Sequence, residues 1–282
     1  MNDLIRRIDF RVFSYEEDPE SVVDMQRCRE TLEGGWLDSA ETCRMNHKVV
    51  ARTPGSSWVL AFGTTVFGYA DMIPGADGTG CVVKWRLHPD FRTPVLARKL
   101  VTGLAREAKT RQYSGLVYLA DTEEVLADLE SIGLKRDRTY GWIQTDDMEP
   151  SPGAEATPVA ADLDEALAEP LLPFLGPPLP PRFVLVRGFL AASYGVFSHS
   201  RPLLHRIRFQ DRSYLGCFDG REWFVFRPTR HDLDREAIKP VLSVLGGLRP
   251  SRILVSQKAA ESANLAFVSN VNQWDLFTPG LG

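Results

Sequence analysis

Hydrophobic side chains recur along the first half of the chain with two spacings, one typical of strands and one typical of a helix. Short apolar or alternating runs predict strands at residues 8–13, 58–62, 66–72, 81–87, 116–120 and 134–144. Leu96, Leu100, Leu104 and Ala108 recur every four residues, which places them on one face of a helix that begins near Thr93. Further helices are predicted at residues 19–32, 39–45 and 123–131. This order predicts an α+β fold with a mixed sheet flanked by helices.

The second half repeats this order. Strands are predicted at residues 203–209, 213–218, 222–227 and 252–256, helices at 232–245 and 258–265, and an extended segment at 266–277. We therefore predict a tandem structural repeat, with an unrelated second α+β domain as the alternative. Nine of the 19 prolines lie between residues 150 and 181, where they interrupt regular structure. The domains predicted on this basis are residues 1–148 and 183–282, joined by a Pro-rich linker at 149–182.

Composition and charge narrow the class of protein. The 282 residues are 44% hydrophobic and 25% charged, with a net charge of −4, which is typical of a globular protein and gives no bulk attraction to nucleic acid or membranes. No apolar run approaches the ~20 residues needed to cross a bilayer, and the N-terminus lacks a signal-peptide core, so we expect a cytoplasmic protein. The four cysteines and five histidines lack the spacing of metal ligands, so no metal is expected.

One segment of the second half is strongly basic. Residues 182–258 carry 14 Lys and Arg against six Asp and Glu. An Arg-rich sheet face in contact with water explains this surplus, and so does a surface for an anionic ligand or partner, with nucleic acid the least favoured of the alternatives.

The segment with the clearest chemical content is a strand-to-helix transition. A strand ends at His88-Pro89 and a helix opens five residues later; the transition contains Arg92, Thr93, Val95, Leu96, Ala97 and Arg98. The first amides of a helix and the positive end of its dipole attract phosphate groups. This segment resembles the acyl-coenzyme-A-binding element of the GNAT-type N-acetyltransferases, a hydrophobic-x-Pro strand end followed by Arg/Gln-x-x-Gly-x-Gly/Ala. The pattern falls on Leu87, Pro89, Arg92, Val95 and Ala97, and the resemblance extends over about residues 8–145.

The resemblance implies a splayed sheet and an activity. Acetyl-coenzyme A would be the acyl donor, with direct transfer to an amine in a ternary complex. The backbone of Trp85, Arg86 and Leu87 would bind the pantetheine arm, residues 92–98 would meet the diphosphate, and Trp36 would contact the acceptor, a small-molecule or protein amine. In the corresponding loop of the second half, residues 227–234, the acids Asp232 and Asp234 would repel phosphate. That half is expected to bind no coenzyme and instead to pack against the first, shape the acceptor pocket or form a homodimer.

The sequence also departs from the family pattern. Val95 replaces the first glycine, Pro94 has no N–H to offer, and the Thr93 hydroxyl competes for an amide of the helix start. The family's Asn falls on Thr122, or on Asp121 with a one-residue slip, and its frequent Tyr acid falls on Leu129. Candidates for the catalytic groups are Asp71 or Asp121 as base and Tyr118 or Tyr140 as acid, with none assigned. We therefore predict an acyl-CoA-dependent N-acyltransferase, with a catalytically inactive GNAT-like binding or interaction protein as the alternative.

Overall fold

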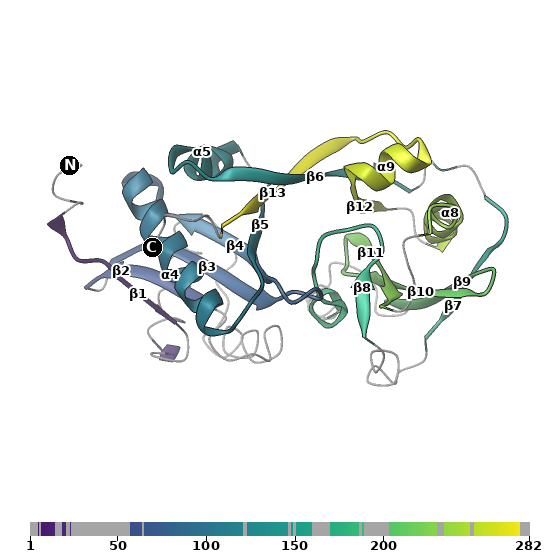
Figure 1. The fold of residues 1–282 in the computed structure, drawn as a ribbon, viewed down its shortest axis with the longest axis horizontal. Coiled ribbons are helices and arrows are strands. Elements are labelled where there is room, and N and C mark those ends of the chain that lie inside the picture. Colours follow the sequence, from purple (N-terminus) through teal and green to yellow (C-terminus); the bar gives the residue numbers. More distant parts are fainter. Residues whose placement is uncertain are drawn as a thin grey trace. The chain divides into compact units, whose positions relative to one another are not determined.

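The computed structural model divides the chain into two compact units (Figure 1). It describes residues 5, 7–14, 19, 20, 23, 57–63, 65–120, 123–145, 148, 151–159, 170–185, 188, 203–229, 234–248 and 251–276. The first unit contains Met1–Pro74, Gly78–Asp137 and Asn272–Gly282, and the second contains Gly75–Asp77 and Arg138–Val271. Residues 272–276, which end the described part of the chain, therefore belong to the first unit.

The first unit is built on a mixed sheet. Its strands are β1 (Arg11–Ser14), β2 (Ser57–Phe62), β3 (Thr65–Pro74), β4 (Gly80–Leu87), β5 (Leu116–Ala120) and the end of β13 (Ser269–Asp275), in that spatial order. Neighbours from β1 to β4 are antiparallel, β4 and β5 are parallel, and β13 is antiparallel to β5. A parallel pair needs a crossover, and the helix α4 (Pro94–Thr110) provides it.

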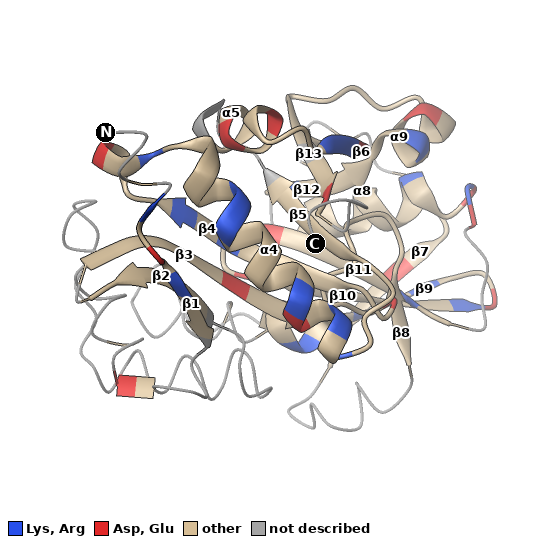
Figure 2. Ribbon diagram, turned by 60° about the vertical axis from the view of Figure 1, so that its left-hand side comes forward, with Lys and Arg blue, Asp and Glu red and all other residues tan. Residues whose placement is uncertain are grey.

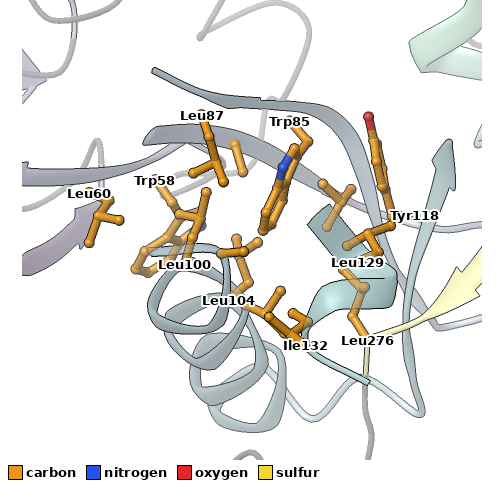
Figure 3. Packing of buried hydrophobic residues seen from close by; sticks show 14 of the residues in the cluster. Trp58, Leu60, Trp85, Leu87, Leu100, Leu104, Tyr118, Leu129, Ile132 and Leu276 are labelled. Atoms are coloured by element: carbon orange, nitrogen blue, oxygen red, sulfur yellow. The ribbon is translucent and has the colours of Figure 1, made fainter. Parts of the chain in front are cut away.

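Helix α4 packs its apolar face on the sheet, together with α5 (Glu123–Ser131). Figure 3 shows Leu100 and Leu104 of α4 beside Trp85 and Leu87 of β4. Leu100 and Trp85 have no exposed surface, and burying a Leu side chain contributes about 1.5–3 kcal/mol. The predicted four-residue period therefore corresponds to the buried face of the helix.

The ends of α4 are also set by the local sequence. The Thr93 hydroxyl caps the N-terminus, Pro94 occupies the first position, and the chain leaves the helix at Gln112, whose φ is 59°. Thr93 and Pro94 were predicted in these places.

The second unit repeats the same order of elements. Its strands are β7 (Ala154–Pro158), β8 (Leu171–Pro173), β9 (Leu204–Phe209), β10 (Arg212–Phe218), β11 (Glu222–Pro228), β12 (Arg252–Ser256) and most of β6 (Lys135–Gln144). The antiparallel run β9-β10-β11 is followed by α8 (Ile238–Leu248), the parallel strand β12 and α9 (Gln257–Ala263). The run β2-β3-β4, α4, β5 and α5 of the first unit is the same succession, as predicted. The α+β fold with a mixed sheet is confirmed in both units.

The last strand of each repeat belongs to the other unit. Strand β6 follows the first repeat in the chain, but its residues from Arg138 onward lie in the second unit and pair antiparallel with β12. Strand β13 follows the second repeat and pairs with β5. This exchange is the reason that the division departs from the predicted boundary at residue 148.

The predicted Pro-rich linker at 149–182 is wrong for the part of it that the structure describes. It contributes β7, which pairs with β9, and β8, which pairs with β11. A central strand donates N–H groups to neighbours on both sides, and proline has no N–H to donate. Proline is tolerated, however, at strand ends and on edge strands. Pro158 and Pro173 both end their strands. The predicted helices at 19–32 and 39–45 lie outside the described residues except for 19, 20 and 23.

Within the described residues, no helix is long and apolar enough to cross a membrane.

Candidate functional site

The two parallel strands of the first unit separate after three residues. Gly80, Cys81 and Val82 of β4 face Leu116–Tyr118 of β5, and this register ends there. Strand β4 nevertheless continues to Leu87 and stays paired with β3 along that length. From residue 83 onward, β4 thus has one edge on β3 and a second edge with no register to β5. This is the splay that the resemblance implied.

The direction of the β4 backbone at this opening follows from one hydrogen bond. The N–H of His88, directly after β4, donates to the carbonyl of Phe67 on β3 at 2.9 Å. Backbone groups of successive strand residues point to opposite edges, so the N–H and C=O of Leu87 and Trp85 point away from β3, toward the opening. The Trp85 carbonyl accepts a hydrogen bond of 2.8 Å from Arg86 Nη1.

A β-bulge lies at the point where the strands separate. Asp71 is opposite Lys84 and Met72 is opposite Val82, so Val83 is an extra residue of β4. A bulge bends its strand and increases the local twist, which accounts for the divergence of β4 from β5. The sequence of β4 alone does not indicate this bulge, because a bulge is defined by the pairing with the partner strand.

The two faces of β4 differ in chemistry beyond the bulge. Trp85 and Leu87 are buried against the helices (Figure 3), whereas Lys84 and Arg86 are half-buried on the opposite face. On that face Tyr69 donates a hydrogen bond of 2.5 Å from its hydroxyl to Asp71 Oδ2, and Lys84 Nζ lies 5.2 Å from the centre of the Tyr69 ring. A carboxylate, a phenol and an ammonium therefore lie together beside the bulge.

The start of α4 offers little to an anion through its backbone. The Leu96 N–H donates to the Thr93 hydroxyl at 3.4 Å, and Pro94 has no N–H. Of the first three helical residues, only Val95 has an amide that the cap does not use. The predicted competition from Thr93 is present, and the anion-binding contribution of this helix start is correspondingly small.

Arg92 does not face the open side of the loop. Its Nε donates to Asp128 Oδ1 at 2.7 Å and its Nη2 to Asp128 Oδ2 at 2.8 Å, a two-point ion pair with α5. Asp128 is 7% exposed and Arg92 is 24% exposed. Arg92 therefore forms a structural ion pair, and its predicted phosphate contact stays a prediction. Arg98, one turn into α4, is exposed, and Lys99 Nζ lies 5.6 Å from the ring centre of Phe10.

The other predicted residues take different places. Leu129, at the position of the family's Tyr acid, is fully buried in the core and donates no proton. Tyr118 is 5% exposed, with its ring centre 6.3 Å from that of Trp85, and Tyr140 lies in the second unit. Ala97 is buried on the face of α4 that packs in the hydrophobic core of the first unit. Trp36, Asp121 and Thr122 lie outside the described residues.

In the second unit, the equivalent opening is filled by the chain itself. Strands β11 and β12 pair only at Glu222–Trp223 with Arg252–Ile253. Strand β8 then pairs with the far half of β11, and the Phe174 N–H donates to the Val225 carbonyl at 2.8 Å. On the other side, the Leu175 carbonyl accepts from the Ser256 N–H at 2.7 Å. Residues 170–175, which we call the plug, thus bond to both diverging strands.

Asp232 and Asp234 are predicted to repel phosphate at the helix start of the second unit. Asp234 lies within the described residues and Asp232 lies outside them. Asp234 Oδ1 accepts from the Glu236 N–H at 3.0 Å, and Oδ2 lies 3.5 Å from Arg212 Nη1. Within the described part of the chain, no group of three His, Cys, Asp or Glu residues is placed to hold a metal ion.

Comparison with known proteins identifies the fold. No protein-family model matches the chain, and no curated protein matches it. A GCN5-related N-acetyltransferase from Anabaena variabilis aligns over 94% of this chain and 72% of its own, with 12% identity and a TM-score of 0.55. Eis1 from Mycobacterium abscessus aligns over 95% of this chain and 74% of its own, with 13% identity and a TM-score of 0.52. With a mixed sheet that splays at a bulge in β4, this chain has the GNAT-type fold of the GCN5-related N-acetyltransferases.

Proposed function

We propose that the first unit binds an acyl-coenzyme A and transfers its acyl group to an amine. The observation that carries this proposal is the edge of β4 that diverges from β5 beyond the bulge, where the backbone N–H groups of Trp85 and Leu87 point toward the opening. The pantetheine arm of coenzyme A is an extended chain with two amide groups, so it can hydrogen-bond to such an edge as a strand does.

The plug of the second unit, residues 170–175, supports this proposal. In the second unit, an opening of the same topology accepts an extended chain by backbone hydrogen bonds to β11 and β12. Recognition of this kind depends on main-chain groups and not on particular side chains. The first unit has the same strand order and, within its described residues, no segment paired along β4 in this place.

The phosphates of the coenzyme would lie at the start of α4. The Val95 amide and the helix dipole attract an anion by about 0.3–1 kcal/mol at an exposed site, and Arg98 supplies a positive charge one turn away. Arg92 has a structural role here, because its ion pair with Asp128 links the loop to α5.

The proposed reaction forms an amide. Acyl-coenzyme A supplies the acyl group as a thioester, whose C–S bond breaks as the C–N bond forms. The acceptor nitrogen must lose a proton before or during this step. Trp85, Leu87 and Leu100 fill the helix-covered side of β4, so an acceptor approaches from the opposite face. Asp71 is the carboxylate on that face and takes the proton, and the Tyr69 hydroxyl holds it in place.

Binding of acetyl-coenzyme A, measured by isothermal titration, tests the proposal. Pro94→Asp is the informative variant, because Pro94 is exposed and an acid at the first helical position stabilises the helix while it repels phosphate. We expect weaker coenzyme binding with unchanged or higher thermal stability. Gln112→Asp adds the same charge beyond the other end of α4 and serves as the control. Absence of binding to the wild type at millimolar ligand, or equal affinity of both variants, would refute the proposal.

A binding protein without acyl transfer is the second candidate. The observation in its favour is Leu129, which is buried where the family has its frequent Tyr acid. A thiol-release assay with acetyl-coenzyme A and a panel of amines separates the two. Tight binding without release of coenzyme thiol supports this second candidate, and release that depends on an amine supports the transferase.

A further inference from the structure

The outer edge of the first unit's sheet lies along a groove. Strand β1 is the first in the sheet order and pairs with β2 on one side, and on its other side the described residues contain no paired strand. A strand in this position presents unpaired N–H and C=O groups. Residues 9–12 all line a groove of about 990 Å³ between β1 and α4. Because successive side chains of an extended chain point to opposite faces, a groove lined by four residues in succession follows the backbone edge.

Helix α4 runs beside β1 in the same direction. The Lys99 Nζ lies 5.6 Å from the ring centre of Phe10, and a Cβ at Gly103 would lie 2.6 Å from Cγ1 of Val12. Four helix residues rise about 6 Å and two strand residues rise about 6.6 Å, so helix and strand advance together. A side chain at position 103 would push them apart, and the glycine therefore keeps the helix wall of the groove next to the strand.

The groove has the length of an extended peptide. Its helix wall reaches from Pro94 to Arg106, which is about 18 Å along the axis of α4. Five residues of an extended chain span about 17 Å. A segment of this kind would add a strand to β1 by main-chain hydrogen bonds and turn its alternate side chains toward α4.

The helix wall of the groove carries positive charge. Lys99, Gly103 and Arg106 are spaced by four and three residues, which places both cations on the side of α4 that faces β1. Arg106 is exposed and Lys99 is half-buried. Figure 2 shows Lys and Arg at intervals along this helix. The side chains that an added strand turns toward α4 would therefore meet cations.

The acids of the groove offset only part of this charge. The lining contains four Lys and Arg residues against two acids, Asp9 and Glu107. Glu107 Oε1 accepts a hydrogen bond of 2.7 Å from Arg111 Nε, so its charge is already compensated. Asp9 is exposed and lies before β1. An occupant of this groove is expected to carry negative charge.

We propose that the groove binds an extended acidic segment of a partner protein, which adds a strand to β1 and places acidic side chains against Lys99 and Arg106. These two cations are about 10 Å apart along α4. Acids two or four residues apart in the partner, roughly 6.6 or 13 Å, are within reach of both flexible side chains. The proposed diphosphate lies at the first turn of α4 and these cations lie in later turns, so peptide binding does not depend on the proposed coenzyme site.

Fluorescence anisotropy of a labelled pentapeptide with the full chain tests the charge requirement. The probe is Glu-Val-Glu-Val-Glu, blocked at both ends, and Lys-Val-Lys-Val-Lys is its control. We expect the chain to bind the first peptide and not the second, with an affinity that falls as NaCl is raised from about 0.05 to about 0.5 M. Arg106→Glu should weaken binding about fivefold or more, because it removes an exposed ionic contact and adds a repulsion. Lys109→Glu makes the same change of charge at an exposed position of α4 outside the groove, and its affinity should stay within about twofold of wild type.

Two N-methylated forms of the Glu peptide test the main-chain pairing. The N–H groups of successive strand residues point to opposite edges. Methylation of one alternate set therefore removes the donors that face β1, and methylation of the other set leaves them in place. One form should bind with the affinity of the parent peptide, and the other about tenfold more weakly or less.

Each of four results would contradict the proposal. Absence of binding of the Glu peptide at about 1 mM protein would show that the groove does not hold such a segment. Equal affinities of Arg106→Glu and Lys109→Glu would place the peptide elsewhere, and equal affinities of both methylated forms and the parent would exclude strand addition. An oligonucleotide of the same charge that binds as tightly, with the same loss in Arg106→Glu, would show a surface for anions in general.

Discussion

Substitutions in the ion pair between Arg92 and Asp128 test whether the loop before α4 has a structural role or a ligand-binding role. Asp128 is 93% buried and accepts two short hydrogen bonds from Arg92. Removal of one partner from a buried pair costs about 3–5 kcal/mol. Because Arg92 is about one-quarter exposed, water compensates part of this loss, and we expect about 2 kcal/mol for Arg92→Gln or Asp128→Asn. For a chain of this size, that lowers the melting temperature by about 4–8 °C.

A double-mutant cycle measures the interaction itself. Because the pair can be broken only once, the double variant should lose about 1–2 kcal/mol less than the sum of the two single variants. Thermal unfolding followed by circular dichroism gives the stabilities, and isothermal titration with acetyl-coenzyme A gives the affinities of the same variants. We expect affinities within about twofold of wild type for the fraction that is folded.

Two results would refute this reasoning. Strictly additive losses of stability would mean that the two side chains do not stabilise each other. A loss of coenzyme affinity of about tenfold or more in Arg92→Gln, with unchanged melting temperature, would mean that Arg92 is a phosphate ligand, as the sequence pattern suggested.

Three further predictions concern stoichiometry, catalysis and pH. The full chain should bind one acetyl-coenzyme A, because the plug occupies the second opening; a calorimetric stoichiometry of two would contradict this. Asp71→Asn should lower kcat for acetyl transfer about 10²-fold with coenzyme affinity unchanged, whereas Asp77→Asn, at an exposed turn, should leave kcat unaffected; equal kcat values would exclude Asp71 as base. Burial raises the pKa of the Cys217 thiol, so the native state keeps its proton where the unfolded state loses it. Stability is therefore retained below the unfolded pKa of about 8.5 and falls above it by up to about 1.4 kcal/mol per pH unit. Urea unfolding at pH 8 and 9.5 measures this loss, which should shrink in Cys217→Ala; an identical loss in the variant would argue against it.

The features that the sequence predicts correctly depend on residues that are close together along the chain. The four-residue period of α4, its cap at Thr93 and the first position at Pro94 are all contained in one short segment. The order of strands and helices followed in the same way, and with it the repeat. These elements are specified by local periodicity and capping, which can be evaluated without knowledge of tertiary partners.

The features that were missed depend on partners distant in the chain. Arg92 and Asp128 are 36 positions apart, and nothing around Arg92 indicates a carboxylate on another helix. The bulge at Val83 exists only relative to β3. The proline content of the plug predicts a linker, because it indicates where regular structure is interrupted and not the strand edge with which a short segment pairs. Partner choice, and therefore most of the candidate site's geometry, is decided by tertiary packing.

The exchange of β6 and β13 has a consequence for the order of events during synthesis. The strand that completes the first unit beside β5 is made roughly 150 residues after β5 itself, which takes on the order of 10–30 s at typical elongation rates. Until then, the nascent polypeptide presents an unpaired strand edge, which is the kind of surface that chaperones bind and that aggregates when left unprotected. The amino-terminal half therefore cannot mature on the ribosome ahead of the rest, and a truncation that removes β13 would damage the proposed coenzyme site.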